Sequence, residues 1–155
     1  MNSDEEASDD AESSVGTVPV ANLHFEAVPA APERLPGLRR ALGEWAQRVG
    51  MDAEQVELLT LASYEALANA AAHAYSDGEG VLEVHATYLP GRARAQVTVT
   101  DFGSWRPESS ERGQLGGRGL MLIRQLAEHA DVSTDATGTA VRMSWTVPAE
   151  APAAR

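Results

Sequence analysis

The sequence predicts a two-layer α+β sandwich, in which helices cover one face of a sheet whose strands mostly pair with their neighbours along the chain. Two segments with the two-residue alternation of strands, Val81–Leu89 and Arg92–Thr100, are joined by a Pro-Gly turn and predict an antiparallel hairpin. Apolar residues with helical spacing occur on both sides of this hairpin. The predicted order of strand, helix, helix, two strands, helix, two strands lacks the repeated βαβ units of a doubly wound fold.

The first predicted strand is Val20–Val28, which alternates in character and stops before a proline. A helix is predicted over Pro32–Val49, where the apolar residues follow one helix face. These residues are Leu35, Leu38, Leu42, Trp45 and Val49. Gly50 ends this helix, because glycine readily adopts the left-handed conformation that follows many helix C-termini.

A second helix is predicted to begin after Asp52 and to run to about Tyr75. Asp52 is followed three positions later by Gln55, which resembles a capping box with Asp in place of Ser or Thr. In such a box each side-chain oxygen accepts a hydrogen bond from the backbone N–H of the other residue, so the pair marks a helix start.

The C-terminal half is predicted to hold one helix and two strands after a polar, Gly-rich loop over Asp101–Gly117. The helix covers Arg118–Ala130, with its large apolar residues on one side. The strands are Asp131–Ala136 and Thr139–Val147, on either side of a turn at Thr137–Gly138.

Composition restricts the class of protein. The chain has 155 residues, no cysteine and no lysine, and a net charge of −11. Residues 1–15 are predicted to be a disordered acidic tail, residues 16–148 one domain and residues 149–155 a frayed end. Six of the 23 acidic residues lie in the tail, so the remainder carries 17 acidic residues against 12 arginines. This charge repels nucleic acid. With no apolar run of ~18 residues and no signal-like start, the expectation is a cytoplasmic protein that does not enter membranes.

Three polar residues, Glu65, Asn69 and His73, interrupt an Ala-rich helix at four-residue intervals. Residues at this spacing share one helix face. The row is compatible with a solvated stripe. It is also compatible with chemistry, in which the Asn holds Mg²⁺ of a bound nucleotide and the Glu acts as a general base. The His would then close the site or bond the chain nearby.

Two Gly-containing segments follow. Asp101 ends a strand and precedes Gly103, which is either a common turn or a base-recognition site where the carboxylate accepts from an exocyclic amine. Gly113–Leu120 precedes a helix, where glycines serve either as a connector or as a phosphate-binding loop. A P-loop is excluded because the chain has no lysine, and the dinucleotide fingerprint fails because Leu122 occupies its third glycine position.

Taken in order, these segments resemble the GHKL ATPases, and most closely the anti-sigma-factor serine-protein kinases. The residues that carry the resemblance are Glu65-x-x-x-Asn69, Asp101-x-Gly103, Gly117-Arg118-Gly119-Leu120 and the segment Gly138–Trp145. It covers residues 18–147. It implies a Bergerat-type sandwich with helices on one face of a mixed, mostly antiparallel sheet, and a pocket for ATP and Mg²⁺ between the helix of Glu65 and the sheet.

The resemblance also implies roles for residues. Asn69 would ligate Mg²⁺, Glu65 would be the catalytic base, and Asp101 would accept from the adenine amine with Gly103 beside the ring. The other nucleotide-binding residues implied are His73, Gly117, Arg118, Gly119, Leu120 and Thr139. One departure is Trp105, which stands where the family often has the second glycine of a D-x-G-x-G box.

The partners implied are an anti-anti-sigma protein of STAS type as phosphoryl acceptor and an RNA polymerase sigma factor, with the chain acting as a homodimer. Three alternatives to an anti-sigma-factor kinase are considered. A non-catalytic, nucleotide-regulated binding protein fits the same residues, although Glu65 favours catalysis. A two-component histidine kinase core is disfavoured because about 50 residues precede the Glu65 helix. A domain without any ligand does not explain three ordered nucleotide-type segments.

Overall fold

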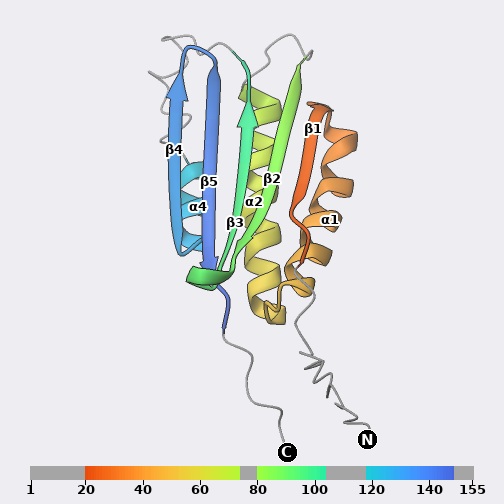
Figure 1. Ribbon diagram of the computed structural model, residues 1–155. Coiled ribbons are helices and arrows are strands. Elements are labelled where there is room, and N and C mark those ends of the chain that lie inside the picture. The colour runs from red at the N-terminus through yellow and green to blue at the C-terminus, as the bar shows by residue number, and fades with distance from the viewer. Residues whose placement is uncertain (1–19, 74–79, 104–117, 149–155) are drawn as a thin grey trace, which may run out of the picture.

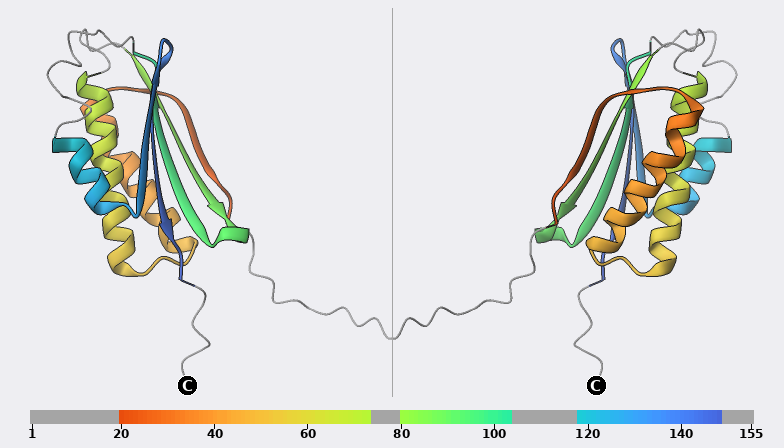
Figure 2. Two further views of the ribbon diagram at one scale, coloured as in Figure 1. Left: turned by 90° about the vertical axis from the view of Figure 1, so that its left-hand side faces the viewer. Right: turned by 90° about the vertical axis from the view of Figure 1, so that its right-hand side faces the viewer.

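The computed structural model describes residues 20–73, 80–103 and 118–148, apart from the side chains of His73 and Arg118. These residues form two layers. A five-stranded sheet makes one layer, and the helices α1 (Leu35–Arg48), α2 (Ala53–His73) and α4 (Arg118–Leu126) cover one of its faces (Figure 1; Figure 2). The predicted two-layer α+β sandwich is confirmed. The predicted acidic tail, most of the Gly-rich loop and the predicted frayed end lie outside the described residues.

The sheet has the strand order β1-β2-β3-β5-β4. Its strands are β1 (Leu23–Pro29), β2 (Val81–Leu89), β3 (Arg94–Asp101), β4 (His129–Asp135) and β5 (Gly138–Thr146). The family resemblance implied a mixed, mostly antiparallel sheet, and each pairing between the described strands is antiparallel. Because β5 lies between β3 and β4, this last described strand joins β4 to the rest of the sheet (Figure 1).

The predicted hairpin of β2 and β3 is confirmed, with Leu82 opposite Asp101 and Leu89 opposite Arg94. The 3-10 turn η2 (Pro90–Arg92) joins the two strands, so β3 begins two residues later than the alternation predicted. Burial alternates along all of β3 and along β2 as far as Ala86, with one set of side chains buried beneath the helices and the other set on the open face.

Helix α1 follows a short 3-10 turn, η1 (Pro32–Arg34), and it buries the apolar residues that predicted it. Gly50 follows the helix with a φ of +100°, which confirms the expected glycine stop. Trp45 is fully buried, and its indole Nε1 donates to the carbonyl of Ala21 at 3.1 Å. This bond fixes the chain before β1 against the helix layer.

The capping box at the start of α2 is confirmed. Gln55 N donates to Asp52 Oδ1 at 2.8 Å, and Asp52 N donates to Gln55 Oε1 at 3.3 Å. The same Gln55 side chain donates through Nε2 to the carbonyl of Thr146 at 2.7 Å. The cap therefore also ties the start of α2 to the end of β5. The helix is described to His73, and the predicted last turn to Tyr75 lies beyond the described part.

Helix α4 ends earlier than predicted. The helix was expected over Arg118–Ala130, but it ends at Leu126, and β4 already begins at His129. The carbonyl of Leu126 accepts a hydrogen bond from Trp145 Nε1 at 3.0 Å. The side chain of Trp145 in β5 thus provides a hydrogen bond to a carbonyl at the end of the helix. The residues from His129 onward join the sheet instead.

Strand β1 also differs from its prediction. It begins at Leu23 rather than Val20, because the side chain of Asn22 accepts from the backbone N–H of Tyr88 at 3.3 Å. A bulge then follows, in which the register shifts between Phe25 and Val28, and Ala27 adopts a φ of +52°. The extra residue returns Val28 to the buried face of the sheet.

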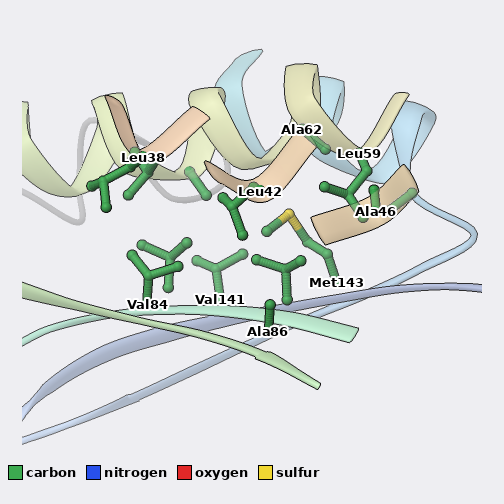
Figure 3. Packing of buried hydrophobic residues seen from close by; sticks show 14 of the residues in the cluster. Leu38, Leu42, Ala46, Leu59, Ala62, Val84, Ala86, Val141 and Met143 are labelled. Carbon is green, nitrogen blue, oxygen red and sulfur yellow. The ribbon is translucent and has the colours of Figure 1, made fainter. Parts of the chain in front are cut away.

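One hydrophobic core fills the space between the layers (Figure 3). Leu38, Leu42 and Ala46 of α1 face Val84 and Val141 of the sheet in this view. The buried residues of α2 that face the core are small or unbranched at Cβ. They are Leu59, Ala62, Ala66, Leu67 and Ala70. The helix can therefore approach its neighbours closely. In the described residues, no helix combines the length and apolar character needed to cross a bilayer.

We expect Ser63→Ala to stabilise the protein. Ser63 is fully buried in α2, and its Oγ has no hydrogen-bond partner among the described residues. A buried hydroxyl without a partner costs about 1–3 kcal/mol, so its removal should raise the free energy of unfolding by about 1 kcal/mol. Urea unfolding of the two proteins measures this. A loss of stability of similar size would show that the hydroxyl is hydrogen-bonded in solution.

Candidate functional site

Glu65 and Asn69 lie at the edge of the buried face of α2. Both are half-buried, and their neighbours Ala66 and Ala70 are buried. A solvated stripe would be exposed, so that interpretation does not describe these two residues. His73 is the last described residue of the helix, and its side chain lies outside the described part of the chain.

Asn69 packs against the start of α4. A Cβ built on Gly119 would lie 2.9 Å from Asn69 Oδ1 and 3.0 Å from its Cγ, and closer still to Nδ2. Real Cβ atoms essentially never come so near, so this side chain fits only because position 119 is glycine. The structure thus brings together two predicted site residues that are fifty positions apart in the sequence.

Asp101 ends β3 and is a buried residue, 7% exposed. Its Oδ1 accepts a hydrogen bond from the backbone N–H of Gly103 at 3.2 Å, which is the turn expected from the Asp-x-Gly spacing. Asp101 lies directly opposite Thr139 of β5. The carboxyl group therefore sits where two central strands meet, and a carboxylate keeps lone pairs for a further donor.

Burial raises the pKa of Asp101 above its ordinary value of 3.8, against the opposing effect of backbone hydrogen bonds from Gly103 and Thr139. Desolvation disfavours the charged form of a carboxyl group. A perturbed, buried carboxyl group at a strand end is a feature typical of binding and catalytic sites.

Gly138, which begins β5, was expected in a turn and was not predicted to be a packing residue of the site. Its φ is +148°, and a Cβ there would lie 2.8 Å from the carbonyl carbon of Asp101 and 2.9 Å from the Cα of Phe102. The start of β5 therefore presses directly on the end of β3. The adjacent Thr139 is buried, with its Oγ1 3.4 Å from Thr134 Oγ1. The signals in the sequence were a glycine at the start of a strand and its place at the head of the segment Gly138–Trp145.

These features gather at one end of the sandwich. The C-terminal end of α2, the end of β3 and the turn between β4 and β5 all lie at the top of the view in Figure 1. The start of α4 lies beside α2, with Gly119 against Asn69 and with Leu120 buried. Gly117 and the side chain of Arg118 lie outside the described residues. A buried acceptor, an amide and a helix N-terminus at one end suit a ligand that carries amine and anionic groups.

Comparison with known proteins identifies this arrangement. The model of the histidine kinase-like ATPase domain matches residues 28–145, which span the helix of Asn69, the strand of Asp101 and the start of α4. The chain belongs to the histidine kinase-like ATPase family. Membership makes it an ATP-binding domain of kinase type.

Two relatives place this ATPase within the family. It is 31% identical over 130 residues to the serine-protein kinase RsbW of Oceanobacillus iheyensis, covering 76% of this chain and 82% of the relative. It is 32% identical over 133 residues to the serine-protein kinase RsbW of Bacillus pumilus, covering 76% of this chain and 81% of the relative. The resemblance to serine-protein kinases of the anti-sigma type is thereby confirmed at the level of the family.

Solved structures agree. The RsbU and RsbW domains of Rv1364c from Mycobacterium tuberculosis superpose on this ATPase with a TM-score of 0.65 and 25% identity, over 81% of this chain and 32% of that one. The histidine kinase domain of the blue-light-activated histidine kinase EL346 from Erythrobacter litoralis gives a TM-score of 0.54 and 26% identity, over 71% of this chain and 61% of that one.

Gly119→Ala should weaken ADP binding without unfolding the ATPase. The added methyl group would displace the Asn69 side chain, while alanine favours a helix over glycine by about 1 kcal/mol. Calorimetric titration with ADP and Mg²⁺ and thermal unfolding together measure both effects. Gly37→Ala in α1 is the matched control, because a Cβ there meets no atom within 4 Å. Equal ADP affinity in both variants would contradict the role of this contact.

Asp101→Asn should stabilise the fold at neutral pH. Because the pKa of Asp101 is raised in the folded state, its contribution to stability is greatest below pH 3.8 and is lost as the pH rises through the raised pKa. The asparagine does not titrate, so the variant's advantage should be present at pH 7 and shrink toward pH 3.8. Denaturant unfolding across this range tests the sign. An advantage that grows in acid would mean that the folded-state pKa is lowered instead.

Proposed function

We propose that this chain is an anti-sigma factor with ATP-dependent serine/threonine protein kinase activity. It would phosphorylate an anti-anti-sigma protein of STAS type and hold an RNA polymerase sigma factor in a partner switch. The observation that carries the proposal is the contact between Asn69 and the backbone at Gly119, which joins the row on α2 to the glycine segment before α4. The similarity to serine-protein kinases RsbW supports the choice of acceptor.

The residues present fit an adenine nucleotide. The buried carboxyl group of Asp101 would accept from the adenine amine, with Gly103 beside the ring and Thr139 at the same end of the base. Such an acceptor favours adenine over hypoxanthine, which presents a carbonyl oxygen in place of the amine. His73 would close the site at the end of α2.

The phosphates would lie at the start of α4. Gly117, Arg118, Gly119 and Leu120 would surround them, because unpaired backbone N–H groups at a helix N-terminus attract anions. Asn69 offers an amide oxygen, which suits Mg²⁺, and the contact of its side-chain amide with Gly119 supports a role next to the proposed phosphate site. When bound, Mg²⁺ would neutralise phosphate charge as the γ-phosphoryl group leaves ADP.

Glu65 lies one helical turn before Asn69, about 5–6 Å away between Cβ atoms. We assign it as the general base. As the hydroxyl oxygen of the acceptor Ser or Thr forms its bond to the γ-phosphorus, the bond from that phosphorus to the β,γ-bridging oxygen breaks. The hydroxyl proton passes to the carboxylate of Glu65, and ADP leaves with the electron pair of the broken bond. Positioning and charge stabilisation supply most of such catalysis, so a small set of residues is sufficient.

The cellular setting follows from the same proposal. Both partners would be soluble regulators of transcription, so we expect the chain to work in the cytoplasm, without direct contact with nucleic acid or membrane. The net charge of −11 agrees with the lack of nucleic-acid binding. The working form would be a homodimer, which sedimentation velocity of the chain alone can test.

Two variants separate the assigned roles. Asn69→Ala should reduce binding of Mg-ATP by at least about tenfold, because the amide ligand is lost. Glu65→Gln should bind Mg-ATP normally but transfer phosphoryl groups about 10²–10⁴-fold more slowly, because the base is removed. Calorimetry measures binding, and radiolabelled transfer to a candidate anti-anti-sigma protein measures activity.

Glu54→Gln is the control, since this exposed acidic residue lies at the far end of the same helix. Normal transfer by both test variants would overturn the site assignment. Tight nucleotide binding by the unaltered chain, with no transfer to any Ser or Thr acceptor, would instead favour a nucleotide-regulated binding protein without catalysis.

A further inference from the structure

The face of the sheet opposite the helices carries a second group of chemically active residues. Figure 2 shows that no described helix covers this face. At its β1–β2 edge lie four residues, which are His24, Glu26, Glu83 and His85. None of them contributes to the nucleotide site, because they are on the other side of the sheet.

Strand register brings these residues together. His24 of β1 lies directly opposite His85 of β2. Glu83 lies two residues before His85, so it points to the same face. In the β1 bulge, Glu26 and Ala27 together stand against the single residue Glu83, between the pairs Phe25–Val84 and Val28–Leu82. The two histidines and two glutamates thus occupy neighbouring positions of one ladder.

The ligand atoms converge on one point. His24 Nε2 lies 2.6 Å from Glu83 Oε1 and 3.5 Å from Glu26 Oε1. One oxygen or nitrogen from each of the three residues lies within 4.8 Å of the other two. The His85 ring stacks on the His24 ring with centroids 4.7 Å apart and planes at 26°. This stacking limits rotation of the imidazole whose nitrogen faces both carboxylates.

A hydrogen bond from His24 to Glu83 accounts for only part of this geometry. One ring nitrogen carries at most one proton, and it faces two carboxylates. The two carboxylates carry like charge and approach each other on neighbouring strands, which is unfavourable unless a cation lies between them. A divalent cation that took the place of the bridging proton, with a small outward shift of the ligand atoms, would replace that repulsion with attraction to both groups.

We propose that His24, Glu26 and Glu83 bind a divalent transition-metal ion of the Zn²⁺ type. Imidazole nitrogen with carboxylate oxygens is a donor set that Zn²⁺ uses, whereas Mg²⁺ prefers oxygen alone. The side chains of His24 and Glu83 are 40% and 33% exposed, so an ion can enter from solvent and keep a water as its fourth ligand. His85 acts as a positioning residue for the ring of His24.

The bound ion would link β1 to the rest of the sheet. β1 is an edge strand, with a bulge and a residue of positive φ in its middle. Coordination by two residues of β1 and one of β2 crosses this weak point. Since an ion that binds only the folded state stabilises it, Zn²⁺ should raise the unfolding temperature.

The experiment uses the full chain without an affinity tag, first treated with chelator. Titration with Zn²⁺ against a chromogenic chelator should give one site per chain, and Zn²⁺ should raise the midpoint of thermal unfolding. His24→Ala and Glu83→Gln should each weaken Zn²⁺ binding by about tenfold or more and remove the thermal shift. His85→Ala should weaken binding less. Excess Mg²⁺ should not compete.

His129→Ala is the matched control, because this exposed histidine belongs to β4 at the other edge of the sheet. It should bind Zn²⁺ as the unaltered chain does. ADP binding should be equal in all these variants, which shows that each is folded and keeps this test separate from the proposed kinase function. Absence of Zn²⁺ binding by the unaltered chain would overturn the proposal. So would Zn²⁺ binding that is kept in the His24 variant but lost in the His129 variant.

Discussion

Close packing around α2 is the constraint on which the rest of the structure depends. The helix lies between α1, α4 and the sheet, and it approaches each through small residues. Gly43 of α1 leaves room for Thr60, because a Cβ at position 43 would lie only 3.1 Å from Thr60 Cγ2. Gly119 of α4 leaves room for Asn69 in the same way. Tight packing makes such positions sensitive to a single added methyl group. The same contacts that hold the layers together therefore fix the orientation of the proposed catalytic row.

Much of the fold could be predicted because local patterns and tertiary packing agree. Alternation predicted which side chains are buried along β3 and along β2 as far as Ala86, and the Asp52–Gln55 pair marked the start of α2 correctly. The errors occur where a distant group intervenes. Trp145 donates to the carbonyl of Leu126 where α4 ends early. The side chain of Asn22 accepts from the backbone N–H of Tyr88, so β1 begins only after it. No local pattern contains such information.

The candidate site divides in the same way. The spacing of Asp101 and Gly103 predicted a turn that is observed with the expected hydrogen bond. The meeting of Asn69 with Gly119 depends on how two helices pack, and the steric need for Gly138 depends on how two strands abut. Spacing along the chain could suggest those residues but not their contacts. Glu65 lies half-buried beside the buried face of α2, and its chemical role stays a proposal.

The strand order has a consequence for biosynthesis. β5 is inserted between β3 and β4, although both precede it in the chain. Until the ribosome has released residue 146, the nascent polypeptide holds a hairpin of β2 and β3 whose open edge lacks its partner. An unpaired edge of this kind is a template for association with other chains, and non-local pairing forms slowly. The chain must therefore be synthesised through β5 before Asp101 gains its neighbour Thr139, and until then the growing chain depends on chaperones or on its own charge to stay dispersed.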